Sequence, residues 1–167
     1  MNIGIVSDTH DNVAAAERAA EIFEAEGVEV VVHCGDFVAP PLLSAFEDVE
    51  LHGVLGNNDG EISGLEAAFD ALGGGSTLHG RFADLTFDGL SVAVLHGESK
   101  AEVETLAAAE EYDYVCYGHH HRREHREDGR TTLLNPGAQF PTVPDEHRTV
   151  AIIDTLSEAV RFRSVLE

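Results

Sequence analysis

The sequence predicts an α/β fold in which mixed β-sheets are covered by helices. In the first half of the chain, short apolar runs alternate with amphipathic stretches of helical period, a pattern typical of parallel strands joined by helices. After Ser76 the pattern changes to pairs of strand-like runs around Asp-Gly turns, which indicates antiparallel hairpins. The length of 167 residues and the hydrophobic content of 43% fit one well-buried core. We therefore expect residues 1–167 to form a single domain.

The first half begins with an apolar run over residues 2–6 that predicts a strand. A helix is expected from about residue 13 to residue 26, because Val13, Ala16 and Ala20 recur at helical spacing and Gly27 provides a stop. The other elements expected in this half are strands at 28–32 and 51–55 and helices at 40–46 and 64–72.

The second half is predicted to contain two hairpins. Strands at 81–87 and 90–95 flank Asp88-Gly89, a dipeptide that favours a two-residue turn, and Asp128-Gly129 separates strands at 122–126 and 131–134 in the same way. A helix at 101–111 and strands at 114–117, 149–154 and 159–165 complete the prediction. We expect the C-terminal third to be antiparallel.

Acidic residues dominate the charge of the chain. There are 31 Asp and Glu against 10 Lys and Arg, which gives a formal net charge of −21. Self-repulsion of this size is best tolerated in concentrated salt, where the Debye length falls to about 3 Å at 1 M, so we expect a halophilic source. The same charge opposes binding of a nucleic-acid polymer through its phosphates. A bound phosphate would need local positive charge, which metal cations could supply.

The sequence also predicts a cytoplasmic protein without a membrane partner. No stretch approaches the roughly 20 consecutive apolar residues of a membrane span, and no basic segment precedes the first strand. Cys34 and Cys116 form no C-x-x-C pair and suggest no disulfide framework, so we expect them to be buried thiols. The sequence leaves homo-oligomerisation open.

Side chains of the types that bind metals follow directly after five of the predicted strands. They are Asp8 and His10, Asp36, Asn57 and Asp59, His96, and His119 and His121, in the order of those strands. In open α/β sheets, ligands bind beyond the carboxyl ends of the strands. We therefore expect these groups to converge on one site.

The ligand types favour a pair of transition-metal ions. Carboxylate, amide and imidazole groups without thiolate suit manganese, nickel, zinc, iron or cobalt better than magnesium or calcium alone, and manganese is the ion we favour. Seven ligands exceed the positions of a single ion. Asp36 is the candidate for a carboxylate that bridges two ions about 3.5 to 4 Å apart.

At these residues the sequence resembles the calcineurin-like metallophosphoesterase superfamily, whose D-x-H, GD, GN-x-D, HG and GH-x-H blocks it matches in order. The matching segments are Asp8-Thr9-His10, Gly35-Asp36, Gly56-Asn57-Asn58-Asp59, His96-Gly97 and Gly118-His119-His120-His121, followed by the turn Asn135-Pro136-Gly137. The match runs from Ser7 to about Ala138. The size of the chain resembles the small YfcE-like phosphodiesterases of bacteria and archaea.

The resemblance implies a four-layer α/β/β/α sandwich with two divalent metal ions. One ion would be held by Asp8, His10, Asp36 and His121, and the other by Asp36, Asn57, His96 and His119. The implied activity is hydrolysis of a phosphodiester bond in a small molecule by a metal-activated hydroxide. No serine or cysteine nucleophile is required, and a G-x-S-x-G motif is absent.

Asn58 and Asp59 are the candidate catalytic residues beside the ligands. Many relatives carry histidine at the position of Asn58, where it is thought to protonate the leaving oxygen. An amide cannot donate a catalytic proton, so we expect activated or strained phosphodiesters to be better substrates than alkyl monoesters. His120 or His33 could substitute as the acid. Asp59 is expected to orient a ligand or the substrate.

Two alternatives to a phosphodiesterase stay open. The same site could serve a phosphomonoesterase, or the chain could be a metal-binding scaffold for protein partners, as a retromer subunit of this fold is. Against the scaffold, every position of the two-metal pattern holds a suitable side chain. Among the other histidines, His33 is expected to be buried and supporting, whereas those outside the motif blocks are expected at the surface or in turns. These are His52, His79, His125 and His147.

Overall fold

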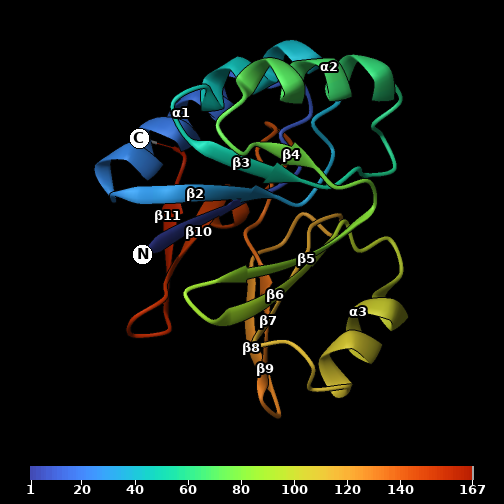
Figure 1. Ribbon diagram of the computed structural model, residues 1–167, viewed down its shortest axis with the longest axis vertical. Helices are drawn as coiled ribbons and strands as arrows, with labels where there is room; N and C mark the ends of the chain where they lie inside the picture. Colours follow the sequence, from blue (N-terminus) through green and yellow to red (C-terminus); the bar gives the residue numbers. More distant parts are fainter. Residues whose placement is uncertain (167) are drawn as a thin grey trace.

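Two β-sheets pack face to face between helices in the computed structural model of the protein, which describes residues 1–166 (Figure 1). The helices α1 (Val13–Ala25) and α2 (Ile62–Leu72) cover the outer face of one sheet, and α3 (Lys100–Ala108) covers the outer face of the other. This arrangement confirms the predicted α/β/β/α sandwich of two mixed sheets flanked by helices.

The first sheet combines four parallel strands with an antiparallel pair. Its strands are β1 (Asn2–Val6), β2 (Val28–His33), β3 (Glu50–Gly53), β4 (Thr77–Leu78), β10 (Thr149–Asp154) and β11 (Ala159–Ser164). Their order across the sheet is β11-β10-β1-β2-β3-β4. The strands β1 to β4 run parallel because a crossover segment joins each of them to the next, while β10 pairs antiparallel with β1.

The second sheet has three parallel strands with an antiparallel strand at each edge. Its strands are β5 (Phe82–Phe87), β6 (Leu90–Leu95), β7 (Tyr114–Cys116), β8 (Glu124–Asp128) and β9 (Thr131–Asn135). Their order is β5-β6-β7-β9-β8, in which β6, β7 and β9 are parallel. The predicted Asp88-Gly89 turn joins β5 to β6, and both of its residues have the positive φ that a tight hairpin turn requires.

Three layers of apolar side chains hold the sandwich together. The central layer lies between the sheets and contains Ile5 of β1, Val32 of β2 and Val94 of β6, each at most 1% exposed. A second layer packs α1 and α2 on the first sheet, and a third packs α3 on the second sheet. Burial from both faces explains why the strands are continuous apolar runs instead of alternating ones.

Particular residues determine where the helix α1 begins and how closely it packs on the first sheet. The side chain of Asn12 accepts a hydrogen bond from the backbone N–H of Ala15 and caps the first turn. Near the other end, the ring of Phe23 lies flat over Gly4 of β1, where an added Cβ would come within 2.7 Å of the ring. Gly4 therefore allows α1 to approach β1, the strand that leads to Asp8, the first of the predicted metal ligands.

Some elements differ from the sequence prediction. The segment Pro40–Phe46, predicted only as a helix, is a 3₁₀ helix, η1. It begins with two prolines, which a first helical turn tolerates because its N–H groups have no intrahelical partner. The two-residue strand β4 was too short to predict from periodicity. The C-terminal third is not uniformly antiparallel, because β9 pairs in parallel with β7. The helices predicted at 64–72 and 101–111 lie at Ile62–Leu72 and Lys100–Ala108.

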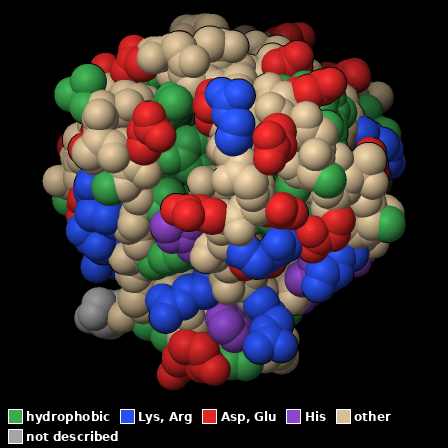
Figure 2. All heavy atoms as spheres, turned by 90° about the horizontal axis from the view of Figure 1, so that it is seen from below, with side chains coloured by type: hydrophobic (Ala, Val, Ile, Leu, Met, Phe, Trp, Pro, Cys, Tyr) green, Lys and Arg blue, Asp and Glu red, His purple; other side chains and the backbone are tan. Residues whose placement is uncertain are grey.

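The surface carries mixed charge where the β8–β9 hairpin and α3 meet solvent. Figure 2 looks onto this end of the molecule and shows basic and acidic side chains interspersed. Arg126, for example, bonds Glu124 at 2.8 Å and Glu104 at 2.7 Å. Within residues 1–166, every helix is too short or too polar to cross a membrane.

Candidate metal centre

The predicted ligands converge where the parallel strands of both sheets end. The loops after β1 and β2 are tied together, since the backbone N–H of Asp8 donates to Gly35 and that of His10 to Asp36. The loops after β6 and β7 are joined in turn by a bond from Gly118 to His96. Side chains from both sheets thereby meet in one place, as the strand-end argument predicts.

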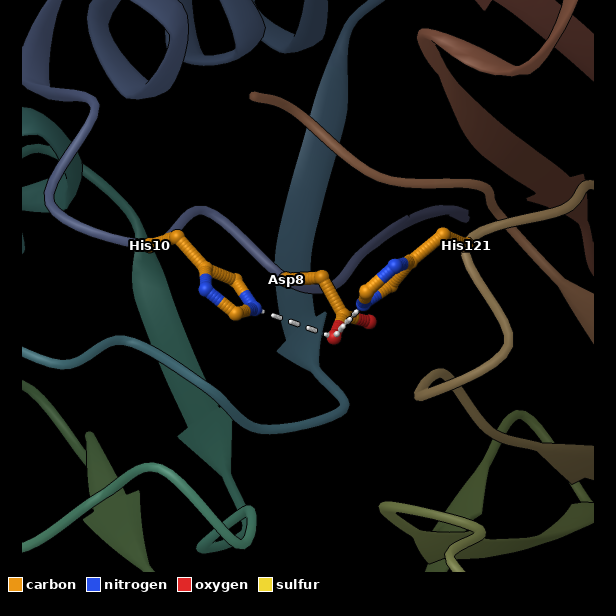
Figure 3. Close-up of side chains that lie close together, drawn as sticks. All are labelled: Asp8, His10 and His121. Atoms are coloured by element: carbon orange, nitrogen blue, oxygen red, sulfur yellow. Dashed lines mark ion pairs between the residues drawn. The ribbon is translucent and has the colours of Figure 1, made fainter. Parts of the chain in front are cut away.

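Asp8 lies at the centre of this cluster with its side chain fully buried. One carboxylate oxygen, Oδ2, accepts hydrogen bonds from the Ser7 hydroxyl at 2.6 Å and from the backbone N–H of His119 at 3.0 Å. The other, Oδ1, faces His10 Nε2 at 3.5 Å and His121 Nε2 at 3.2 Å. Figure 3 shows the two imidazoles approaching this carboxylate from opposite sides. One oxygen thus fixes the side chain and the other is left for a ligand.

Asp36 connects histidines that come from different sheets. Its Oδ2 lies 3.1 Å from Nε2 of His10 and 3.3 Å from Nε2 of His96. Asn58 also binds this carboxylate, donating its backbone N–H to Oδ1 and its side-chain amide to Oδ2. Asp36 is therefore the group through which the two halves of the cluster meet.

Asn57 and His119 lie on the open side of the cluster. His119 Nδ1 is 3.1 Å from Oδ1 of Asn57, and the His119 ring packs edge-to-face on His96 with 5.2 Å between centroids. Among the described residues, the ligand atoms that lie close enough to share an ion fall into two groups. These are Asp8, His10 and His121, and Asp8, Asp36 and His96. His119 is outside both groups, although it contacts His96.

The backbone at the site is unusual. Positive φ angles occur at five of the seven predicted ligands, namely Asp8, His10, Asp36, His119 and His121. Residues other than glycine rarely adopt this left-handed conformation, and where they do it is most often at functional sites. The tight turns after the strands therefore aim consecutive polar side chains into one space at a conformational cost.

Asp59 and Gly56 shape the loop that faces Asp36. The Asp59 carboxylate accepts three backbone N–H bonds, from Asp36, Val38 and Gly56, at 2.8 to 2.9 Å. Gly56 packs so closely that an added Cβ would lie 2.1 Å from Oδ1 of Asp36. Asp59 thus ties the loop after β3 to the loop after β2.

Two buried residues that were not predicted as site residues support the site. Asn135, at the end of β9, donates from its side chain to the carbonyl of Gly118, just before His119. Gln139 donates its backbone N–H to the carbonyl of Asp8 and accepts a bond from Asn12 at its own carbonyl. The Asn-Pro-Gly turn pointed to Asn135, whereas nothing in the local pattern singled out Gln139.

The remaining highlighted histidines divide into supporting and distant ones. His33 is buried as expected, close to Thr9 Oγ1 at 3.1 Å and accepting the N–H of Gly35. Burial lowers its pKa to about 3, so it stays neutral. His52 and His79 form a pair with 2.8 Å between ring nitrogens, on β3 and just after β4. His120 is exposed beside His119.

The buried carboxylates of the cluster favour a positively charged group beside them, either a protonated histidine or a bound cation. Burial alone would raise the pKa of Asp8, but the nearby imidazoles of His10 and His121 hold that pKa well below its usual range. At Asp36, burial would also raise the pKa, but hydrogen bonds from His10, His96 and Asn58 lower it below its usual range. The carboxylates in return raise the pKa of His10 to about 9. Bound cations would compete with protons for these nitrogens.

The donors present fit divalent metal ions. Within the described part of the chain, three buried atoms of the cluster make no hydrogen bond: Asp8 Oδ1, His10 Nε2 and His96 Nε2. Buried polar atoms are seldom left without a partner, and an ion is one of the explanations that such atoms call for. Carboxylate oxygen and imidazole nitrogen are ligands that first-row transition ions accept.

Comparison with known proteins identifies relatives over nearly the whole chain. Residues 1–158 match the model of the calcineurin-like phosphoesterase superfamily domain. A phosphodiesterase of Methanocaldococcus jannaschii is 34% identical over 166 residues, which cover 96% of this chain and 97% of that protein.

Solved structures agree with this assignment. A structure described as a novel archaeal phosphodiesterase superposes with a TM-score of 0.89 at 34% identity, covering 98% of this chain and 99% of the other. The phosphoesterase YfcE of E. coli superposes with a TM-score of 0.69 at 18% identity, covering 99% of this chain and 100% of the other, and supports the fold alone.

Proposed function

Because the chain belongs to the calcineurin-like phosphoesterase superfamily, we propose that it hydrolyses phosphodiester bonds of small molecules at a centre of two divalent metal ions. The observation that carries this proposal is the convergence of Asp8, Asp36 and His96 from three strand ends. Asp8 Oδ1 and His96 Nε2 are buried there without a hydrogen-bond partner among the described residues. The relative of 34% identity is itself called a phosphodiesterase.

The proposed ligand sets share Asp36. One ion would be held by Asp8, His10, Asp36 and His121, and the other by Asp36, Asn57, His96 and His119. The distances of 3.1 and 3.3 Å from Asp36 Oδ2 to His10 and His96, one histidine from each set, support a bridging role. Two such ions would bind the phosphoryl oxygens and activate a water molecule as Lewis acids.

Residues that do not bind the ions would orient those that do. His96 Nδ1 is 2.7 Å from the carbonyl oxygen of Cys34, which favours a free electron pair on Nε2. Asp59, with three backbone bonds, is better suited to positioning Asp36 than to reaching a substrate. Asn58 is exposed and already bonded to Asp36, so it could hydrogen-bond a phosphate oxygen beside the bridging ligand.

The acidic charge limits the classes of substrate that the protein could bind, and the ligand types limit the metal ions. A net charge of −21 supports a small phosphate ester over a nucleic-acid polymer, because a polymer would be repelled along its length. The mixture of oxygen and imidazole ligands supports manganese, with nickel, zinc, iron and cobalt as competitors. A phosphomonoesterase would use the same site, but Asn58 provides no proton for a poor leaving group.

The test is an assay of purified protein in concentrated salt. The protein is stripped with a chelator, refilled with Mn²⁺, Ni²⁺, Zn²⁺, Co²⁺ or Mg²⁺, and offered an aryl diester, an aryl monoester and cyclic nucleotides. We expect diester turnover that needs metal and that Asp36→Asn abolishes. Absence of turnover on every phosphate ester at full metal occupancy would reject the enzyme and favour the scaffold.

A further inference from the structure

A pocket opens directly beside the proposed metal centre. It has a volume of about 440 Å³ and lies between the loop after β7 and the segment that precedes β10. His121, one of the proposed ligands, forms part of its wall, together with Arg122, Phe140, Thr142, Val143 and His147. A group bound here would therefore lie next to a phosphate at the metal centre.

Phe140 lines this pocket and also packs against two of the proposed ligands. Its ring packs against His10 and against His121, with 4.6 Å between centroids in each case, and the contact with His121 is edge-to-face. The residue also lines the pocket and is only half-buried, so part of its surface remains open to a bound molecule. Gln139, its neighbour in sequence, is bonded to Asp8 and fixes the segment in place.

The lining suits a flat ring with a polar edge. Phe140, Val143 and Pro144 offer apolar surface, and an aromatic ring prefers edge-to-face or offset contact with another ring. Arg122 contributes a guanidinium that, within residues 1–166, makes neither an ion pair nor a side-chain hydrogen bond. A guanidinium can stack on a ring or donate to its polar edge. The volume falls in the range of about 300 to 1,000 Å³ typical of small-molecule sites.

We propose that the pocket at Phe140 is a subsite for an aromatic or heterocyclic group carried by the phosphate ester. The substrate class is then an aryl or nucleoside-like phosphodiester, with its phosphate at the metal centre and its ring against Phe140. The inference rests on the proposed function. A purely alkyl group would contact only the apolar part of the wall and make no use of the exposed polar groups of Arg122 and Thr142.

The test compares two ligands whose P–C bonds are not hydrolysed. Phenylphosphonate and methylphosphonate are titrated calorimetrically into the manganese-loaded protein in concentrated salt. We expect phenylphosphonate to bind about tenfold more tightly, as burial and packing of one ring against another would give. Phe140→Leu, which keeps an apolar side chain against the two imidazoles, and Thr142→Trp, which fills the pocket from its exposed rim, should each reduce the preference below about threefold.

Two controls separate this subsite from the metal centre. Thr86→Trp places the same bulk on exposed β5, outside the pocket, and should keep the preference. Metal content and methylphosphonate affinity should stay unchanged in Thr142→Trp. Equal binding of the two ligands to the wild type, or a preference that survives both pocket variants, would overturn the subsite alone. Binding of neither ligand would reject the phosphate site and, with it, both proposals.

Discussion

His96 Nδ1 lies 2.7 Å from the backbone carbonyl oxygen of Cys34. A carbonyl oxygen can only accept, so the proton of the neutral imidazole is on Nδ1 and the electron pair is on Nε2. That nitrogen is buried without a hydrogen bond and faces Asp36 at 3.3 Å. Cys34 itself is a fully buried thiol directly after β2, so the loop that follows this strand fixes the orientation of a proposed ligand from the other sheet.

The close approach of Gly56 to Asp36 allows the role of Asp36 to be tested with a matched pair of glycine-to-alanine variants. In Gly56→Ala the new Cβ would lie 2.1 Å from Asp36 Oδ1 and must displace the carboxylate, whereas Gly60→Ala adds a methyl group to open space. Misplacement by about 1 Å can reduce turnover about 100-fold, so we expect Gly56→Ala to lose bound metal and diesterase activity. Metal analysis and initial rates should show Gly60→Ala unchanged, and normal metal content in Gly56→Ala would contradict the proposed role of Asp36.

Asn58 offers a test of the missing general acid. Asn58→His restores an imidazole beside Asp36, and acid catalysis typically contributes about 10²- to 10⁴-fold where the leaving group is poor. We expect the hydrolysis rate of alkyl esters, relative to that of aryl esters, to rise about tenfold or more in this variant. Asn58→Gln, which keeps an amide, is the control. Equal ratios in the wild type and Asn58→His would mean that another group already supplies the proton.

His33 should make stability depend on pH. Its folded-state pKa of about 3 lies below the value of about 6.5 expected in the unfolded chain. Between these values the unfolded state binds a proton that the folded state excludes, so stability falls as the pH drops below about 6.5, by up to ~1.4 kcal/mol per pH unit.

The pH dependence is measured by denaturant unfolding of stripped protein from pH 7 to pH 4. His33→Gln carries no titrating group at this position. Its free energy of unfolding should therefore change less steeply with pH, by an amount that corresponds to close to one bound proton. Parallel curves for the two proteins would show that His33 is protonated in the folded state as readily as in the unfolded one.

The excess of acidic side chains predicts salt-dependent stability. With a net charge of −21, repulsion acts against the compact state at low ionic strength. Thermal unfolding should therefore shift to higher temperature as KCl is raised from 0.1 M to about 2 M, with most of the rise complete once the Debye length is near 3 Å. Sucrose at matched osmolality is the control. Greatest stability in dilute buffer would contradict a halophilic origin.

The sequence predicted the existence of the longer strands well because burial from both faces leaves a strong apolar signal. Some ends were displaced: β3 ends at Gly53 and not at residue 55, and β8 is Glu124–Asp128 in place of 122–126. Val30, Val31 and Val32 are each at most 3% exposed and lead directly to Asp36. The same logic located His96 after β6. It could not predict which strands pair, so the parallel contact of β9 with β7 was missed, since pairing depends on tertiary packing and not on local pattern.

Side-chain detail at the site depended on long-range contacts. Asp59 was expected near a ligand, but its bonds to the backbone of Asp36 and Val38 cross from one loop to another and leave no trace in spacing. Phe140 lies outside every motif, yet the fold places it against His10 and His121. The pairing of His52 with His79 was likewise hidden, because the short strand β4 brings them together.

The most direct test of the central claim is the number of ions that the site binds. Stripped protein is titrated with Mn²⁺ while bound metal and aryl diester turnover are followed together. We predict two ions per chain, turnover that reaches its plateau only at the second, and one remaining ion in both His121→Ala and His119→Ala. Full turnover at one ion per chain, or turnover in the stripped protein, would contradict a two-metal phosphodiesterase.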